Sequence, residues 1–131
     1  MQAIIPVAGA GTRLRPLTYT QPKVLISVAG KPILSYIIDN LVQNGITSFV
    51  FVIGYLGEKI KEFVEQNYSH LNVQFVTQEE RLGLGHAIWQ ARDVIDKNQE
   101  LIIQLGDTIL DADIKTILSL NYSTLCIKKV E

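Results

Sequence analysis

The chain has one cysteine, Cys126, among its 131 residues. A single cysteine cannot form an internal disulfide, so the sequence excludes a disulfide-stapled fold. Cys126 lies in an apolar run of strand length, and unpaired cysteines are most often small buried residues. We therefore expect a strand over residues 124–127, with Cys126 in the core and without a reactive role.

An excess of charge of one sign is also missing, because 12 basic and 13 acidic residues leave a net charge of −1 and no basic run occurs. Nucleic acids and anionic membranes are bound by basic patches, so we expect neither partner. No apolar stretch has the length of a membrane span, and the N-terminus does not read as a signal peptide. These features predict a cytoplasmic protein, and association into a homo-oligomer stays open.

Histidine is scarce, and the two that occur are His70 and His86. Neither has acidic or cysteine partners at the spacing of a zinc site or a nucleophile relay. We expect both histidines to be structural.

The chain is long enough for one domain with a hydrophobic core and short for two, since 47% of its 131 residues are hydrophobic. We therefore expect a single domain over residues 1–131. Apolar runs of strand length alternate with helical patterns, which predicts an α/β fold with a mostly parallel sheet covered on both faces. The expected strands are 2–7, 49–53, 73–76, 101–105 and 124–127, and the expected helices are 32–45, a segment after Gly57, 85–95 and a short one near 114–118.

A glycine loop follows the first expected strand. Gly9 and Gly11 lie where that strand ends, and ligands bind beyond the carboxyl ends of strands in open α/β sheets. Glycine lets backbone N–H groups approach an anion without a Cβ in the way. Arg13 adds a planar fork of donors and Lys23 a compact positive charge. This combination predicts a site for a polyphosphate.

Two better-known glycine motifs do not fit this loop. A dinucleotide fingerprint would need a third glycine where Leu14 stands and an acidic residue where the sequence has Ile53-Gly54-Tyr55. A Walker loop would need Gly-Lys-Ser/Thr, but Gly30-Lys31 is followed by Pro32.

Two more segments are expected at the same edge of the sheet. Asp107 follows the fourth strand, where a carboxylate could hold Mg²⁺ against phosphate oxygens. Its alternative role is that of a turn or helix-capping residue. Gln78 precedes a loop that contains Gly83 and Gly85, and its amide offers a donor and an acceptor to the edge of uracil or thymine. The alternative is an ordinary surface loop in which Gly85 eases entry into the next helix.

The segment Gly9-x-Gly11-Thr12-Arg13-Leu14-x-Pro16-Leu17-Thr18, with Pro22-Lys23, resembles the signature of the sugar-1-phosphate nucleotidyltransferases, also called NDP-sugar pyrophosphorylases. The resemblance covers essentially the whole chain, and it implies a three-layer, Rossmann-like fold. Later segments that are similar to elements of the family are Gly30–Ile33, Gln78 with Gly83, and Gly106-Asp107. Residues 82–87 are most similar to uridylyltransferases that act on glucose 1-phosphate, whereas the N-terminal third is equally like thymidylyl- or guanylyltransferases.

This resemblance implies a reaction and a role for each residue. An NTP, UTP or dTTP above all, would give its nucleoside monophosphate to a sugar 1-phosphate, glucose 1-phosphate above all, and pyrophosphate would leave. Arg13 would steady the leaving pyrophosphate, Lys23 the region of the α-phosphate, and Asp107 would hold Mg²⁺. The nucleotide-binding residues implied by the match are Ala8, Gly9, Gly11, Thr12, Gln78 and Gly83.

The chain departs from the family pattern at its end. Members continue into a sugar-binding half with a second metal carboxylate, and Lys128–Glu131 resembles the strand before that half. We therefore expect a truncated domain that is inactive or incomplete alone. Two alternatives stay open: a non-catalytic nucleotide-binding or regulatory module of the same fold, and a guanylyltransferase that acts on mannose 1-phosphate.

Overall fold

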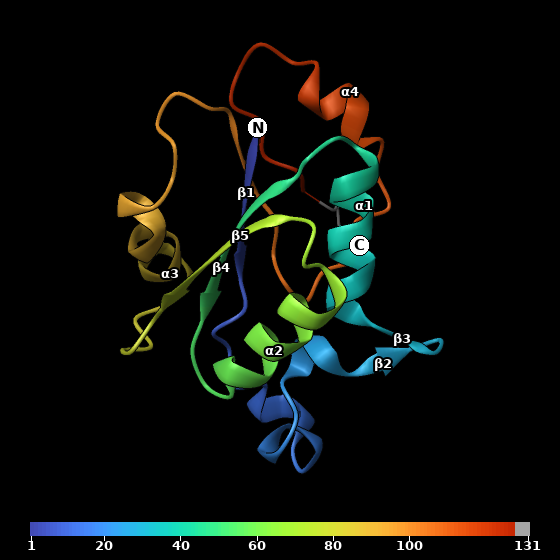
Figure 1. Cartoon of the computed structure of the whole chain (residues 1–131), viewed down its shortest axis with the longest axis vertical. Coiled ribbons are helices and arrows are strands. Elements are labelled where there is room, and N and C mark those ends of the chain that lie inside the picture. The colour runs from blue at the N-terminus through green and yellow to red at the C-terminus, as the bar shows by residue number, and fades with distance from the viewer. Residues whose placement is uncertain (128–131) are drawn as a thin grey trace.

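The computed structural model describes residues 1–127, so the resemblance seen at Lys128–Glu131 lies outside the described residues. Its main sheet has four parallel strands in the order β5-β4-β1-β6 (Figure 1). The strands are β1 (Gln2–Pro6), β4 (Ser48–Ile53), β5 (Asn72–Thr77) and β6 (Leu101–Ile103). The strands β4 and β5 are therefore added on one side of β1, and β6 is added on the opposite side of β1. The predicted parallel α/β sheet is confirmed.

Helices cover the sheet on two sides. The helices α1 (Ile33–Gln43) and α2 (Gly57–Asn67) lie on one side of the sheet, and α3 (Leu84–Gln90) lies on the other (Figure 1). A short hairpin of β2 (Ser27–Val28) and β3 (Lys31–Pro32) leads into α1. A five-residue helix, α4 (Ile114–Leu118), follows β6. This arrangement confirms the three-layer fold that the sequence predicts.

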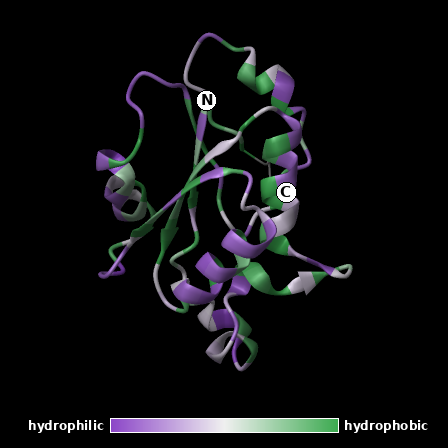
Figure 2. Ribbon diagram, viewed as in Figure 1, coloured by the Kyte–Doolittle hydropathy of each residue, from purple (hydrophilic) through white to green (hydrophobic). Residues whose placement is uncertain are grey.

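The alternation of side chains along β1 and β4 divides the core into two parts, since neighbouring residues of a strand face opposite sides. The larger part lies against α1 and α2 and contains Ala3, Ile5, Phe49, Phe51, Leu34, Ile38 and Ile60. The smaller part lies against α3 and contains Ile4, Val50, Val52, Ala87 and Ala91. Figure 2 shows that the central strand β4 is hydrophobic, as a strand between two core parts must be, whereas much of α2 is hydrophilic.

Three expectations from the sequence are wrong in detail. The helix expected at 85–95 ends at Gln90 and continues as a 3-10 turn over Ala91–Asp93. The strand expected at 101–105 ends at Ile103. The sheet is also covered unevenly, because Leu101 and Ile103 are 41% and 45% exposed. The reason is that β6 is an edge strand with β1 as its neighbour, and α3 packs over β1 and β4 instead.

The strand expected at 124–127 is also absent, and Cys126 is exposed instead of buried. An apolar run becomes a strand only when a neighbouring strand accepts its backbone hydrogen bonds. These residues pair with no strand of the described chain, and Leu125 and Ile127 are 84% and 83% exposed.

Candidate nucleotide site

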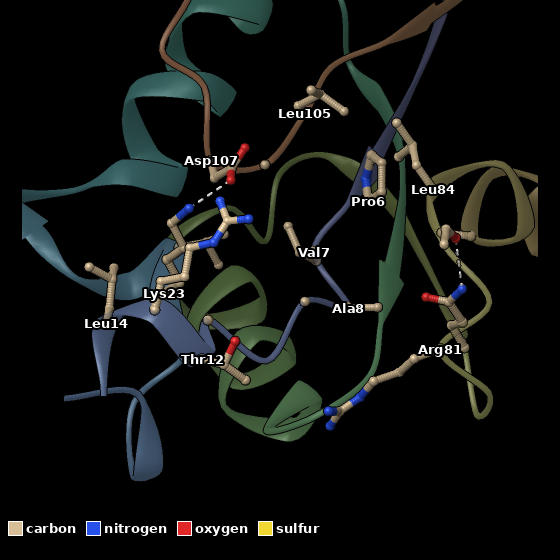
Figure 3. A pocket seen from close by; sticks show the side chains of 18 residues that line it. Pro6, Val7, Ala8, Thr12, Leu14, Lys23, Arg81, Leu84, Leu105 and Asp107 are labelled. Atoms are coloured by element: carbon tan, nitrogen blue, oxygen red, sulfur yellow. Dashed lines mark hydrogen bonds and ion pairs between the residues drawn. The ribbon is translucent and has the colours of Figure 1, made fainter. Parts of the chain in front are cut away.

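A cavity of ≈570 Å³ opens beyond the carboxyl ends of β1 and β6. Strand order reverses between these two strands, which is where open α/β sheets bind ligands. Every site residue expected from the sequence lines this cavity: Ala8, Gly9, Gly11, Thr12, Arg13, Lys23, Gln78, Gly83 and Asp107. Figure 3 shows Lys23 and Asp107 on one side of the cavity, Arg81 and Leu84 on the other, and Val7 and Ala8 between them.

The turn at Gly11 requires glycine. Its φ is +59°, in the left-handed region, and a Cβ there would lie 2.8 Å from Thr18 Cγ2. The buried hydroxyl of Thr18 donates a hydrogen bond to the Gly11 carbonyl at 2.7 Å. Thr18 therefore holds the loop at Gly11 in place. It is part of the motif noted in the sequence, but its spacing from Gly11 does not predict this contact.

The loop after β1 has backbone donors without internal partners, and Ala8, Gly9, Gly11, Thr12 and Arg13 of this loop line the cavity. Val7 N–H donates to the Val52 carbonyl, and the next intramolecular backbone donor along the chain is Leu14. Within the described chain, the N–H groups of residues 8–13 thus have no hydrogen-bond acceptor. Successive free N–H groups form a concave site for an anion. Gly9 borders this site, and a Cβ at Gly9 would have no neighbouring atom within 4 Å.

The structure pairs Lys23 with Asp107. Lys23 Nζ donates to Asp107 Oδ2 at 2.7 Å (Figure 3). This hydrogen bond and the lysine's charge lower the pKa of the Asp107 carboxyl below its ordinary value, although partial burial opposes the shift. The side chains are 35% and 45% exposed, so the pair contributes at most about 1 kcal/mol to folding. Lys23 and Asp107 can therefore separate, and each can contact a ligand instead, at little cost in free energy.

Asp107 fits the role of one metal ligand. Like an ordinary aspartate it is ionised at neutral pH, and its lowered pKa keeps it so at more acidic pH. Mg²⁺ commonly uses one or two carboxylates together with substrate phosphates. Among residues 1–127, no group of three or more histidine, cysteine, aspartate or glutamate side chains is placed to hold a metal. The site therefore supplies a single carboxylate, which suits a metal that arrives with phosphate.

Gln78 lies at the other side of the cavity and is 7% exposed. Its Nε2 donates to the Gly83 carbonyl at 3.2 Å and contacts His86 Nδ1 at 2.9 Å. Gly83 has a φ of +93°, which lets the chain turn back toward Gln78 before α3 begins. The side chain of Gln78 is therefore held in place from two directions.

The sequence does not predict a contact that Arg81, which lines the cavity, makes with Tyr55. The guanidinium carbon of Arg81 lies 5.6 Å from the centre of the Tyr55 ring, and Tyr55 Oη donates to the Tyr19 carbonyl at 2.9 Å. Arg81 follows β5 and Tyr55 follows β4. The two residues come together because Ile53 of β4 pairs with Thr77 of β5. This strand register cannot be predicted from a single sequence.

None of the helices in residues 1–127 is long and apolar enough to cross a membrane.

Comparison with known proteins identifies the family of the chain. A family model described as nucleotidyl transferase matches residues 2–124. UTP--glucose-1-phosphate uridylyltransferase AglF of Haloferax volcanii is 40% identical over 87% of this chain and 46% of its own length. The bifunctional protein GlmU of Methanococcus vannielii is 40% identical over 91% of this chain and 27% of its own length.

A solved structure extends the comparison to the fold. HddC from Yersinia pseudotuberculosis, complexed with GMP-PN, has a TM-score of 0.77 and 28% identity over 89% of this chain and 52% of that one. The chain thus spans about half or less of these proteins. The family match over residues 2–124 confirms the resemblance found in the sequence, and the chain belongs to the nucleotidyl transferase family.

Proposed function

We propose that this chain is the nucleotide-binding half of a sugar-1-phosphate nucleotidyltransferase that uses UTP or dTTP and glucose 1-phosphate. The observation that carries the proposal is that the N–H groups of residues 8–13 have no acceptor within the described chain, and that all of these residues except Ala10 line one cavity together with Lys23. Backbone donors and two cations of different shape suit a triphosphate.

The chemistry that this site would support is displacement at the α-phosphorus of the NTP. A phosphate oxygen of the sugar 1-phosphate forms a bond to that phosphorus, and the bond to the bridging oxygen of pyrophosphate breaks. The leaving group takes the electron pair, so no covalent enzyme intermediate is needed. Such a transfer depends on positioning and on neutralising charge, which is what Arg13 and Lys23 offer. Arg13 would steady the pyrophosphate and Lys23 the α-phosphate.

Asp107 is the residue that would hold Mg²⁺ in this cavity. When bound, Mg²⁺ would neutralise charge on the phosphate oxygens and help to orient them. Asp107 would give up its contact with Lys23 in exchange, and both partners would then face the phosphates. The weak, exposed pair makes this exchange feasible.

The base would lie at the Gln78 side of the cavity. The Gln78 amide with the main chain at Ala8, Gly9 and Gly83 would contact the nucleoside, and Gly11 and Thr12 complete the nucleotide loop. The uridylyltransferase name of the Haloferax volcanii relative supports UTP and glucose 1-phosphate. The GMP-PN bound to HddC keeps a guanylyltransferase acting on mannose 1-phosphate as the second candidate.

The experiment that tests this function uses the full-length enzyme that the proposal implies. It would be supplied with Mg²⁺, with glucose 1-phosphate or mannose 1-phosphate, and with UTP, dTTP or GTP in turn, and the NDP-sugar and pyrophosphate would be measured. We expect both products with UTP or dTTP. Products with GTP and mannose 1-phosphate alone would favour the second candidate. Tight NTP binding without turnover would instead identify a regulatory module.

A further inference from the structure

Three polar side chains form a row behind the Gln78 side of the cavity. His86 Nδ1 lies 2.9 Å from Gln78 Nε2, and His86 Nε2 lies 2.7 Å from Gln90 Nε2. His86 and Gln90 are four residues apart on α3, so they share one face of the helix. Of the three, Gln78 lines the cavity, whereas His86 and Gln90 do not.

Counting donors and acceptors fixes how this row is bonded. An amide nitrogen donates and cannot accept, whereas a neutral imidazole has one N–H and one bare nitrogen. The two ring nitrogens of His86 therefore cannot both face amide nitrogens. One of the two glutamines must turn its oxygen toward the ring, since amide oxygen and nitrogen are distinguished by their partners and not by their shape.

The Gly83 carbonyl decides which glutamine turns. Gln78 Nε2 lies 3.2 Å from this carbonyl oxygen, so reversing the Gln78 amide would place two acceptors against each other. Gln78 therefore keeps its nitrogen toward Gly83 and His86, and His86 Nδ1 accepts. The proton of His86 is then on Nε2, and Gln90 presents its oxygen to that N–H.

The remaining group of the row is the carbonyl oxygen of Gln78. It accepts no hydrogen bond within the described chain, yet no buried side-chain oxygen or nitrogen there lacks a partner. This oxygen must therefore reach solvent through the small part of Gln78 that is not buried, and Gln78 lines the cavity. The cavity receives an acceptor from Gln78, while both N–H donors of the amide are used internally.

We infer that His86 and Gln90 are positioning residues that set the base preference of this site through the orientation of the Gln78 amide. The inference rests on the proposed function. An acceptor at this place matches a base with a ring N–H on its Watson–Crick edge, as in uracil, thymine and guanine. Cytosine carries a bare ring nitrogen there, so it would face the Gln78 oxygen with a second acceptor.

The first test needs no nucleotide. Long-range ¹H–¹⁵N correlation spectra of the 131-residue chain report which imidazole nitrogen of each histidine carries the proton, and a His86→Asn variant assigns the His86 signals. We expect the Nε2–H form for His86 at mildly alkaline pH. A predominant Nδ1–H form would overturn the inference.

The second test changes Gln90, which lies outside the cavity. Gln90→Glu keeps an acceptor for His86 Nε2–H, whereas Gln90→Lys offers a donor and favours the proton on Nδ1. Lysine and glutamate are comparable in length and in helix propensity, so the two variants form a matched pair. The readout is the ratio of the UTP and CTP dissociation constants, measured by calorimetry at the same alkaline pH.

We expect Gln90→Glu to keep the preference for UTP and Gln90→Lys to reduce it by at least about fivefold, the size of one hydrogen bond. An unchanged ratio in Gln90→Lys, with UTP still bound, would overturn the inference and leave the proposed function intact. Failure of the unmodified chain to bind any NTP would count against the proposed site, whereas a predominant Nδ1–H form in the histidine spectra would overturn the inference on its own.

Discussion

Replacing Lys23 with alanine in the full-length enzyme is expected to lower kcat/KM for NDP-sugar formation by about a hundred- to a thousandfold. The loss of one preorganised hydrogen-bond donor to a charge that develops in the transition state has an effect of about this size. Lys23 lines the cavity beside the free N–H groups of residues 8–13, and its partner Asp107 is expected to bring Mg²⁺ to the same phosphates. Asp107→Ala should therefore cause a loss of similar size.

The matched control is Lys31→Ala. Lys31 is also paired with an aspartate, Asp39, and its Nζ lies 4.8 Å from the centre of the Tyr36 ring, but it does not line the cavity. We expect turnover close to that of the unmodified enzyme. Because the Lys23 pair is exposed, both lysine variants should fold normally, which circular dichroism would check. Near-normal turnover in Lys23→Ala and Asp107→Ala would contradict the site assignment.

Two glycines of the site should respond in opposite ways to the same added methyl group. A Cβ at Gly106 would overlap Val7 Cγ1 and lie 2.9 Å from the Pro6 carbonyl oxygen, so Gly106→Ala must shift Val7 or move the segment after β6 away from β1. We expect a loss of about 1–3 kcal/mol in the free energy of unfolding. The measurement is the denaturation midpoint in urea and by heat.

Gly9→Ala is the counterpart. The added Cβ meets no atom within 4 Å and the φ of Gly9 is not positive, so the stability of the chain should be unchanged or slightly raised. On the proposed function the methyl group would occupy space that the bound nucleotide needs, and we expect the UTP dissociation constant to rise at least about tenfold. Equal stability losses in both variants would mean that the space beside Gly9 is not kept for a ligand.

The sequence predicts the sheet and the membership of the cavity because both depend on local patterns. Continuous apolar runs such as residues 49–53 indicate strands buried on both faces, and alternating strands and helices bring every carboxyl end to one edge. Gly9, Gln78 and Asp107, which are far apart along the chain, could therefore be placed together before the structure was known.

What the sequence could not predict depends on partners. The apolar run at 124–127 has the composition of a strand, but it has no neighbouring strand in the described chain. The Lys23–Asp107 pair joins residues 84 positions apart and needs their exact approach. His86 has no acidic or cysteine neighbour in the sequence, and its contact with Gln78 arises only when α3 packs beside the end of β5.

The most direct test of a nucleotide site in this chain is calorimetric titration with UTP, dTTP, GTP, CTP and ATP in Mg²⁺, on the unmodified chain, Arg13→Ala and Arg15→Ala. Arg13 lines the cavity, whereas Arg15 does not. The guanidinium carbon of Arg15 lies 5.0 Å from the centre of the Tyr19 ring instead. We predict selective binding of UTP or dTTP that weakens at least about tenfold in Arg13→Ala and stays unchanged in Arg15→Ala. Binding that is equally strong in all three proteins, or absent from the unmodified chain, would contradict the account.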